Sequence, residues 1–144
     1  MKTVSVGQLL QGKGSGVLSV TPATRVFDAL KLMAEKNVGA LLVMNGDTLL
    51  GILSERDYAR KVILLGKSSH EITVSDIMSG KPVTVTPKQT VDDCMELMSG
   101  RRIRHLPVID NGRVIGVLSI GDLVKAIIEI QRETIKQLES YIHT

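Results

Sequence analysis

The chain of 144 residues contains two copies of one unit, offset by 65 positions. Residues 20–61 align with residues 85–126 without a gap, and 13 of the 42 aligned pairs are identical. Average composition would give roughly three identities by chance. The similarity extends upstream, where VGQLL (6–10) resembles VSDIM (74–78). The duplication predicts two equivalent units that bury their apolar faces against each other around a pseudo-twofold axis.

Both copies predict the same order of elements. Short strands in VLSVTP and PVTVTP end at Pro22 and Pro87. A helix follows, and two strands then flank the turn sequences NGD and DNG, which are typical of hairpins. A second helix begins at Ser54 or Ser119. The order strand–helix–strand–strand–helix, present twice, predicts an α/β fold.

The first helix of each copy has one apolar face, and the second copy has a clear start signal. Thr90 with Asp93 three residues later predicts a capping box, whereas Arg25 stands at the aligned position of the first copy. The apolar faces are formed by Val26, Leu30 and Met33 and by Val91, Met95 and Met98.

The predicted domains are residues 4–66 and 72–130, joined by the polar linker LLGKSSHEI (64–72). The last helix is expected to continue to about residue 142. Its apolar stripe suits either a contact between subunits or packing on its own module, and the sequence leaves both open. The stripe consists of Leu123, Ile127, Ile130, Thr134, Leu138 and Tyr141.

Composition narrows the classes of function. The net charge is only +3, and the aromatic residues are Phe27, Tyr58 and Tyr141, which disfavours a single-strand nucleic-acid binder and suits a small anionic ligand. No apolar run approaches the ~20 residues of a membrane span, and no signal peptide is recognisable. The single cysteine, Cys94, is expected to be a buried and inert core thiol, and the chain to be cytoplasmic.

Catalytic and metal-binding patterns are not found in the sequence. The three histidines are scattered without metal-ligand spacing, and no nucleophile–base pair is evident. GKGSG (12–16) lacks the residues of a phosphate-binding loop and is interpreted as a flexible loop. We therefore expect a protein that is not an enzyme and has no catalytic cofactor or metal.

The repeated Ser-x-x-Asp permits two interpretations. Ser54 with Asp57, and Ser119 with Asp122, can be helix caps and nothing more. Alternatively, the free N–H groups of each helix start attract phosphate, and the aspartate accepts both hydroxyls of a ribose. A glycine three residues before each serine would allow close approach of the backbone.

Positive charge lies near both repeated motifs. Arg56 and Lys61 lie beside the first helix start. The second repeat contains RRIRHLPV (101–108), in which Arg102 and Arg104 would share a face if the segment is extended. Arginine suits phosphate because its planar guanidinium donates two parallel hydrogen bonds, but an arginine-rich strand start is more often simply solvated.

These features resemble the CBS domain, named for cystathionine β-synthase, whose tandem pairs are called Bateman modules. The resemblance covers residues 4–130 and rests on LSVTP (18–22) and VTVTP (83–87) and on GILSERD (51–57) and GVLSIGD (116–122). It is strongest to free-standing bacterial CBS pairs, and it implies two β-α-β-β-α repeats packed as one pseudo-twofold module, which often forms a homodimer.

The resemblance also implies ligands and residues. CBS pairs bind adenosine-containing molecules in the clefts between repeats, so an AMP-like nucleotide is expected, with NAD possible. The aspartates would hold ribose beside the serines, and the basic pair would hold phosphate; in the first repeat the aligned strand start lacks a basic residue, so the two sites should differ. The expected ligand-binding residues are Thr21, Gly39, Ala40, Ser54, Arg56, Asp57, Thr86, Arg104, His105, Ser119 and Asp122.

The predicted function is therefore a sensor that binds AMP, ADP or ATP and signals to an unknown partner protein. The alternatives are a sensor of NAD(H) or S-adenosylmethionine, a nucleic-acid binder acting through Arg101, Arg102 and Arg104, and a ligand-free interaction scaffold.

Overall fold

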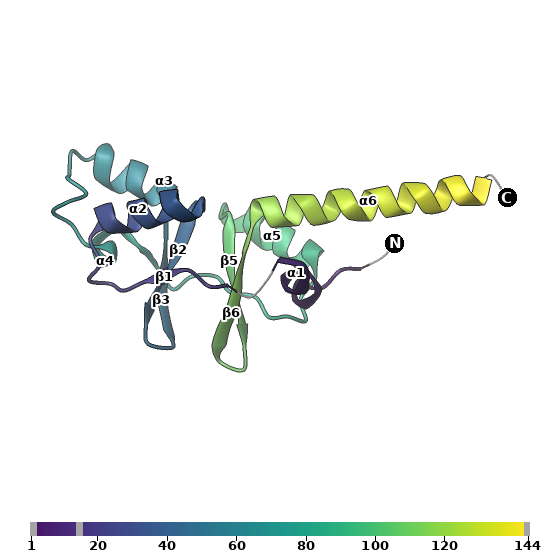
Figure 1. The fold of residues 1–144 in the computed structure, drawn as a ribbon, viewed down its shortest axis with the longest axis horizontal. Coiled ribbons are helices and arrows are strands. Elements are labelled where there is room, and N and C mark those ends of the chain that lie inside the picture. The colour runs from purple at the N-terminus through teal and green to yellow at the C-terminus, as the bar shows by residue number, and fades with distance from the viewer. Residues whose placement is uncertain (1–2, 14–15, 143–144) are drawn as a thin grey trace. The chain divides into compact units, whose positions relative to one another are not determined.

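The computed structural model describes residues 3–13 and 16–142 and shows two compact α/β units. One unit is Gly16–Val83, and the other joins the N-terminal segment to the residues from Thr84 onward (Figure 1). Each unit contains the hairpin of one repeat. The predicted α/β class and the duplication are confirmed, while the domain limits 4–66 and 72–130, which follow the chain order, stay a prediction.

The unit Gly16–Val83 is built on a four-stranded sheet in the order β1-β2-β3-β4. Strand β1 is parallel to β2, and the other two pairs are antiparallel. Its core is formed by apolar residues of α2, β2, β3 and α4. The elements are β1 (Ser19–Val20), α2 (Val26–Lys36), β2 (Ala40–Asn45), β3 (Thr48–Ser54), α3 (Glu55–Tyr58), the π-helical turn η1 (Ala59–Ile63), α4 (Val74–Ile77) and β4 (Ser79–Gly80).

The other unit has a two-stranded sheet, β5-β6, covered by three helices. Its elements are α1 (Val6–Lys13), α5 (Val91–Arg101), β5 (His105–Asp110), β6 (Arg113–Ser119) and α6 (Ile120–Ile142).

The strand predicted in PVTVTP is wrong. In the first repeat Leu42 donates its N–H to Leu18 and so extends the pairing with β1. Pro107 stands at the position aligned with Leu42 and has no N–H to donate. The pairing of Val85 with Val108 is therefore reduced to an isolated parallel bridge.

The two hairpins repeat in detail. Each has a register shift at the same aligned place, between Val43 and Met44 in one hairpin and between Val108 and Ile109 in the other. The predicted tight turns are confirmed: Asn111 and Gly112 connect β5 to β6 with φ of 52° and 77°. Positive φ at both central residues suits the right-handed twist of the flanking strands.

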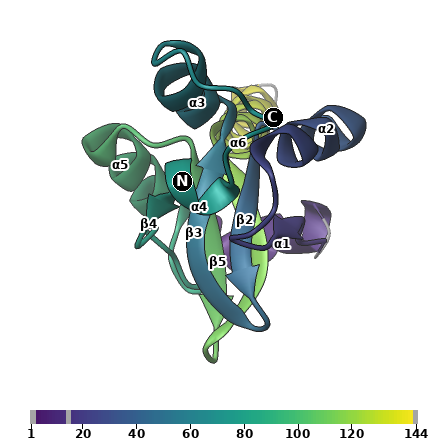
Figure 2. The ribbon, with the colours of Figure 1, turned by 90° about the vertical axis from the view of Figure 1, so that its left-hand side faces the viewer.

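The short N-terminal helices are exchanged between the repeats. Helix α1 precedes the first repeat in sequence but packs in the unit of the second, where Val6 N–H donates to Gln89 and Gly7 N–H to Pro87. Helix α4 precedes the second repeat but packs on the unit of the first, where Val74 N–H donates to Thr24 (Figure 2). Each compact unit therefore combines segments of both repeats.

The segment before β5 differs from the expected extended strand. Arg102 ends α5 in the left-handed conformation, with φ 54° and ψ 44°, and its N–H donates to the Met98 carbonyl. Because Arg102 belongs to the helix end and not to a strand, it does not share an extended face with Arg104, and that expectation is wrong.

The apolar stripe expected along α6 splits into two parts. Leu123 is buried, and Ile127, Ile130 and Thr134 are half-buried against their own unit. Leu138 and Tyr141 are exposed. Helix α6 reaches Ile142, the last residue that the structure describes, and Figure 1 shows it running well past β5, β6 and α5.

Candidate functional site

The repeated serine and aspartate cap helices in both units. Ser54 Oγ accepts from the Asp57 N–H at 3.1 Å, while Asp57 Oδ2 accepts from the Ser54 N–H at 3.0 Å. Ser119 and Asp122 make the same two bonds at 3.2 and 2.8 Å. The capping interpretation is therefore confirmed, and it explains why the two residue types recur three positions apart.

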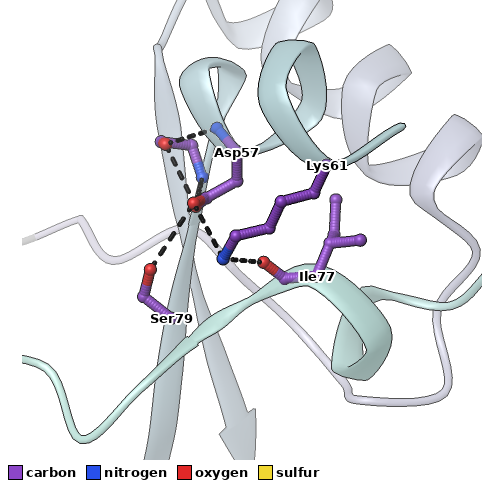
Figure 3. Close-up of polar contacts among 5 residues, drawn as sticks. Asp57, Lys61, Ile77 and Ser79 are labelled. Carbon is purple, nitrogen blue, oxygen red and sulfur yellow. Dashed lines mark hydrogen bonds and ion pairs between the residues drawn. The ribbon is translucent and has the colours of Figure 1, made fainter. Parts of the chain in front are cut away.

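Asp57 makes contacts that a cap does not require. Its Oδ1 lies 3.4 Å from Lys61 Nζ and accepts from Ser79 Oγ at 3.5 Å (Figure 3). The Lys61 ammonium also donates to the Ile77 carbonyl at 3.0 Å. Lys61 lies one turn after Asp57 in the same helical segment, so the pair is local.

Asp122 has a lysine partner of a different origin. Lys13 Nζ, at the end of the exchanged helix α1, lies 2.6 Å from Asp122 Oδ2 and donates to the Val117 carbonyl at 2.7 Å. The position aligned with Lys61 is Ala126, so the second repeat has no lysine on its own helix at this point. Both aspartates are thus paired with an ammonium group, although the lysines come from unrelated positions.

The Thr90–Asp93 and Thr73–Asp76 capping boxes provide a comparison. Both capping boxes are present, and the Thr90 box was predicted from the sequence. Asp93 and Asp76 lie on the surface, however, and neither makes an ion pair among the described residues. Because capping alone does not require a lysine, the ion pairs set Asp57 and Asp122 apart from the ordinary caps of the same fold.

Asp122 lies in a group of titratable side chains that shift one another's pKa. Burial would raise the pKa of this carboxyl, but the hydrogen bonds from Lys13 and Ser119 outweigh burial and lower it. The pKa of His105 is also lowered, chiefly by burial and then by the nearby ammonium of Lys13, with Arg104 adding to the effect and Asp122 opposing it. Asp122 is thus paired with Lys13 and acts on the neighbouring His105, and Arg104 adds positive charge beside that histidine.

The strand starts lie directly beside the helix starts, as the site prediction requires. Ala40 pairs with Ser54 in the sheet, and the Gly39 carbonyl accepts from the N–H of the first residue of α3. In the other unit His105 pairs with Ser119, and the Arg104 carbonyl accepts from the Ile120 N–H. The structure brings these predicted residues together within each unit.

The two predicted threonines lie away from the strand starts, and the remaining predicted residue is Arg56, directly before Asp57. Thr21 follows the Val20–Val43 pair and Thr86 follows the Val85–Val108 bridge, so each threonine lies toward the far end of its neighbouring strand. Arg56 is exposed on α3. Within its own unit, neither threonine adjoins the aspartate, and their role in binding stays a prediction.

Lys13 was missed because GKGSG was interpreted as a flexible loop. The upstream similarity does contain a signal, since it extends beyond VGQLL to align Gly12-Lys13 with Gly80-Lys81. Lys13 instead completes helix α1, while Gly14 and Ser15 lie outside the described residues. A lysine kept in register in both exchanged segments, at the end of α1 and directly after β4, was the available clue.

The repeated glycine has a different purpose from the one expected. A Cβ on Gly51 would lie 2.6 Å from the Ser79 carbonyl oxygen and 2.9 Å from Met78 Sδ. A Cβ on Gly116 would lie 2.7 Å from Leu10 Cδ2. Each glycine thus admits the exchanged segment that packs on its strand, which accounts for its recurrence without any ligand.

Other groups in the described residues offer no further chemistry. Burial raises the pKa of the Cys94 thiol to about 11, with Asp93 adding to the effect, so the thiol is protonated and inaccessible. No group of three potential metal-ligating side chains occurs in residues 3–13 and 16–142. Within the same ranges, no helix has the length and apolarity needed to cross a bilayer.

Two α/β repeats, each with a helix-capping aspartate at the end of its hairpin, define a tandem-repeat module. The chain belongs to the CBS-domain family: the family model matches residues 14–63 and 74–129. It is a tandem CBS pair, and such modules typically have regulatory and signal-transduction roles. CBS domains commonly bind adenosine-containing ligands.

Three relatives illustrate the similarity. The CBS domain-containing protein CBSX3 of Arabidopsis thaliana, named as mitochondrial, is 41% identical over 98% of this chain and 73% of its own. A candidate signal-transduction protein with CBS domains from Burkholderia ambifaria is 50% identical, with a TM-score of 0.85 over 88% of this chain and 95% of that one. The hexameric CBS-CP12 protein from bloom-forming cyanobacteria is 26% identical, with a TM-score of 0.76 over 95% and 88% of the two chains.

Proposed function

We propose that this CBS pair is a sensor that binds an adenine nucleotide, AMP in the first place, and signals its presence to a partner protein. The observation that supports the proposal is the ion-paired state of the repeated aspartates. Asp57 and Asp122 cap helices as Asp76 and Asp93 do, yet only the former pair also attract a lysine among the described residues. A carboxylate with this surplus of donors around it can exchange them for the hydroxyls of a ribose.

The Asp122 group is the stronger candidate for a phosphorylated ligand. Lys13 pairs with Asp122, and Lys13 and Arg104 both lie near enough to His105 to lower its pKa. Once a sugar takes the carboxylate, the positive charge of Lys13 and Arg104 is left for a phosphate. The Asp57 group has Lys61 but an uncharged strand start at Gly39 and Ala40, so we expect a weaker site or a ligand with less phosphate.

Calorimetry of AMP binding to an Asp122→Ala variant tests the proposal. The expected result is a loss of affinity of about tenfold or more, because a charged hydrogen-bond acceptor is removed. Asp93→Ala is the matched control: it removes the same kind of capping carboxylate in the same unit, with bonds of 3.0 and 3.1 Å. Equal affinities in the two variants would remove the site assignment.

A panel of ligands then identifies the class of sensor. We expect AMP, ADP or ATP to raise the melting temperature more than S-adenosylmethionine does, because S-adenosylmethionine has no phosphate for Lys13 and Arg104 to bind. NAD(H) has a diphosphate and is therefore the competing ligand of the panel. If none of these ligands stabilises the protein, the helix-cap interpretation suffices and the chain is a scaffold. The expected homodimer, the partner protein and the cytoplasmic location stay predictions.

A further inference from the structure

Helix α6 carries a second apolar face that its own unit does not cover. The core face of the helix contains Leu123 and Ala126, which are buried. The second face is rotated from it by roughly a quarter of a turn, at 3.6 residues per turn. We define the outer stripe as Val124, Ile128, Gln131, Ile135, Leu138 and Ile142.

The outer stripe has the spacing of a coiled coil. Its members are separated by four, three, four, three and four residues, which is the alternation of a heptad repeat. The apolar members are exposed over large fractions of their surface: Val124 44%, Ile128 43%, Ile135 53%, Leu138 59% and Ile142 76%. Isolated apolar residues on a surface are ordinary, but five in one heptad register form a continuous seam.

The end of the helix needs such a contact. From residue 131 to residue 142 only Thr134 is half-buried, and the other side chains are exposed. Figure 1 shows this part of α6 extending beyond the rest of its unit. A helical segment of about 12 residues is marginally stable in water without packing. Its continuation to Ile142 is therefore explained by a partner along the outer stripe.

The chemistry of the stripe matches a second copy of itself. All charged residues between 124 and 142 lie outside the stripe, so two identical seams meet without charge repulsion at the centre. Isoleucine occupies one heptad position three times, at 128, 135 and 142, and the alternate position holds Val124, Gln131 and Leu138. Isoleucine at the first position, with leucine at one of the second positions, favours two parallel strands. The polar Gln131 favours the register in which it faces its own copy, because only there does its amide find a partner.

We propose that the outer stripe of α6 pairs with the outer stripe of a second copy of the chain, forming a two-stranded parallel coiled coil. Gln131 then faces Gln131 of the second copy, where the two amides satisfy each other. The pairing is argued from the spacing and exposure of the stripe and does not rest on the proposed nucleotide site.

The first test is the mass of the protein in solution, measured by light scattering after gel filtration. Ile135→Glu combined with Leu138→Glu is expected to halve the mass of the assembly that the unchanged chain forms. Gln137→Glu combined with Ser140→Glu adds the same charge on the same helix outside the stripe and is expected to change nothing. Circular dichroism verifies that both variants are folded. The proposal is overturned if the two variants have equal masses or if the unchanged chain is a monomer. In either case the outer stripe would bind a different protein.

A second measurement tests the pairing directly. Gln131→Cys is expected to form a disulfide-linked dimer on mild oxidation, because the two thiols meet at the seam. Gln137→Cys lies off the stripe and serves as the control. The natural Cys94 is buried and does not interfere. Cross-linking of Gln131→Cys no greater than that of Gln137→Cys overturns the parallel register, even if the glutamate variants unfold.

Discussion

Lys13 lies 2.6 Å from Asp122 although 109 positions separate them in the chain. The contact joins the end of an exchanged helix to the aspartate that the repeat places at a helix start. In the first repeat the corresponding aspartate obtains its lysine from four residues away. The two halves of the duplication have therefore reached the same local charge arrangement by different routes.

Replacement of Lys13 by methionine should destabilise the protein by about 0.5–1 kcal/mol at neutral pH, the size expected of a partly exposed ion pair. The pKa of Asp122 is lowered in the fold, so this contribution is present above the carboxyl pKa of the unfolded chain, about 4. It is lost as the pH falls through the lower pKa of the folded state. Urea unfolding of the variant and the unchanged protein at neutral and at acidic pH measures the difference in the free energy of unfolding.

The control for this variant is Lys81→Met, which changes the aligned lysine at the end of the other exchanged segment. It should leave stability nearly unchanged at both pH values. If Lys13→Met and Lys81→Met cost the same, the Lys13 contact contributes nothing specific.

The same Lys13→Met variant should raise the pKa of His105. Burial lowers this pKa first, Lys13 lowers it further, and loss of the lysine also leaves Asp122 free to attract the protonated imidazole. In the unchanged protein His105 should titrate below about 6.5, the ordinary histidine pKa, and protonating it should cost stability as the pH falls below that value. Titration of the histidine ring signals by NMR measures the His105 pKa in both proteins. An unchanged His105 pKa in the variant would contradict the prediction.

Alanine at the two repeated glycines should have unequal costs. At Gly51 the new Cβ meets the Ser79 backbone oxygen at 2.6 Å, which cannot turn away. At Gly116 it meets Leu10 Cδ2 at 2.7 Å, the end of a flexible side chain. We expect about 3 kcal/mol for Gly51→Ala and about 1 kcal/mol for Gly116→Ala, the range of overpacking. Thermal or urea unfolding of both variants measures the two losses of stability. A larger loss for Gly116→Ala than for Gly51→Ala would contradict this explanation.

Arg25→Thr should stabilise the protein. Arg25 begins α2 without a side-chain cap, in an extended conformation that threonine accepts, and Asp28 already stands three residues later. A capping box is then possible, as Thr90 and Asp93 form one in the other unit, with a gain of about 0.5–1 kcal/mol. The exposed bond from Arg25 to the His70 carbonyl is lost and offsets part of the gain. Thr90→Arg is the reciprocal variant and should destabilise by a similar amount.

Local signals predicted the elements well. The hairpin turn at Asn111-Gly112 and the helix starts at Ser54 and Thr90 follow from short-range chemistry, and the structure has them. One error arose where a neighbour in space decided the outcome, and the other arose from a helix end that was not recognised in the sequence. Pro107 prevented the extension of a strand more than twenty positions away, and Arg102 adopted a helix end in place of an extended strand.

The sequence by itself determined the duplication, the α/β class, the turns and the helix caps, because each depends on residues close together in the chain. Only the tertiary structure decided which repeat each short helix joins, since α1 and α4 are equally compatible with either hairpin by pattern. That exchange brings Lys13 to Asp122 and requires the glycines at 51 and 116. The tertiary structure also shows which face of α6 is buried in the core and that the outer stripe is exposed, which the periodicity of the sequence alone does not distinguish.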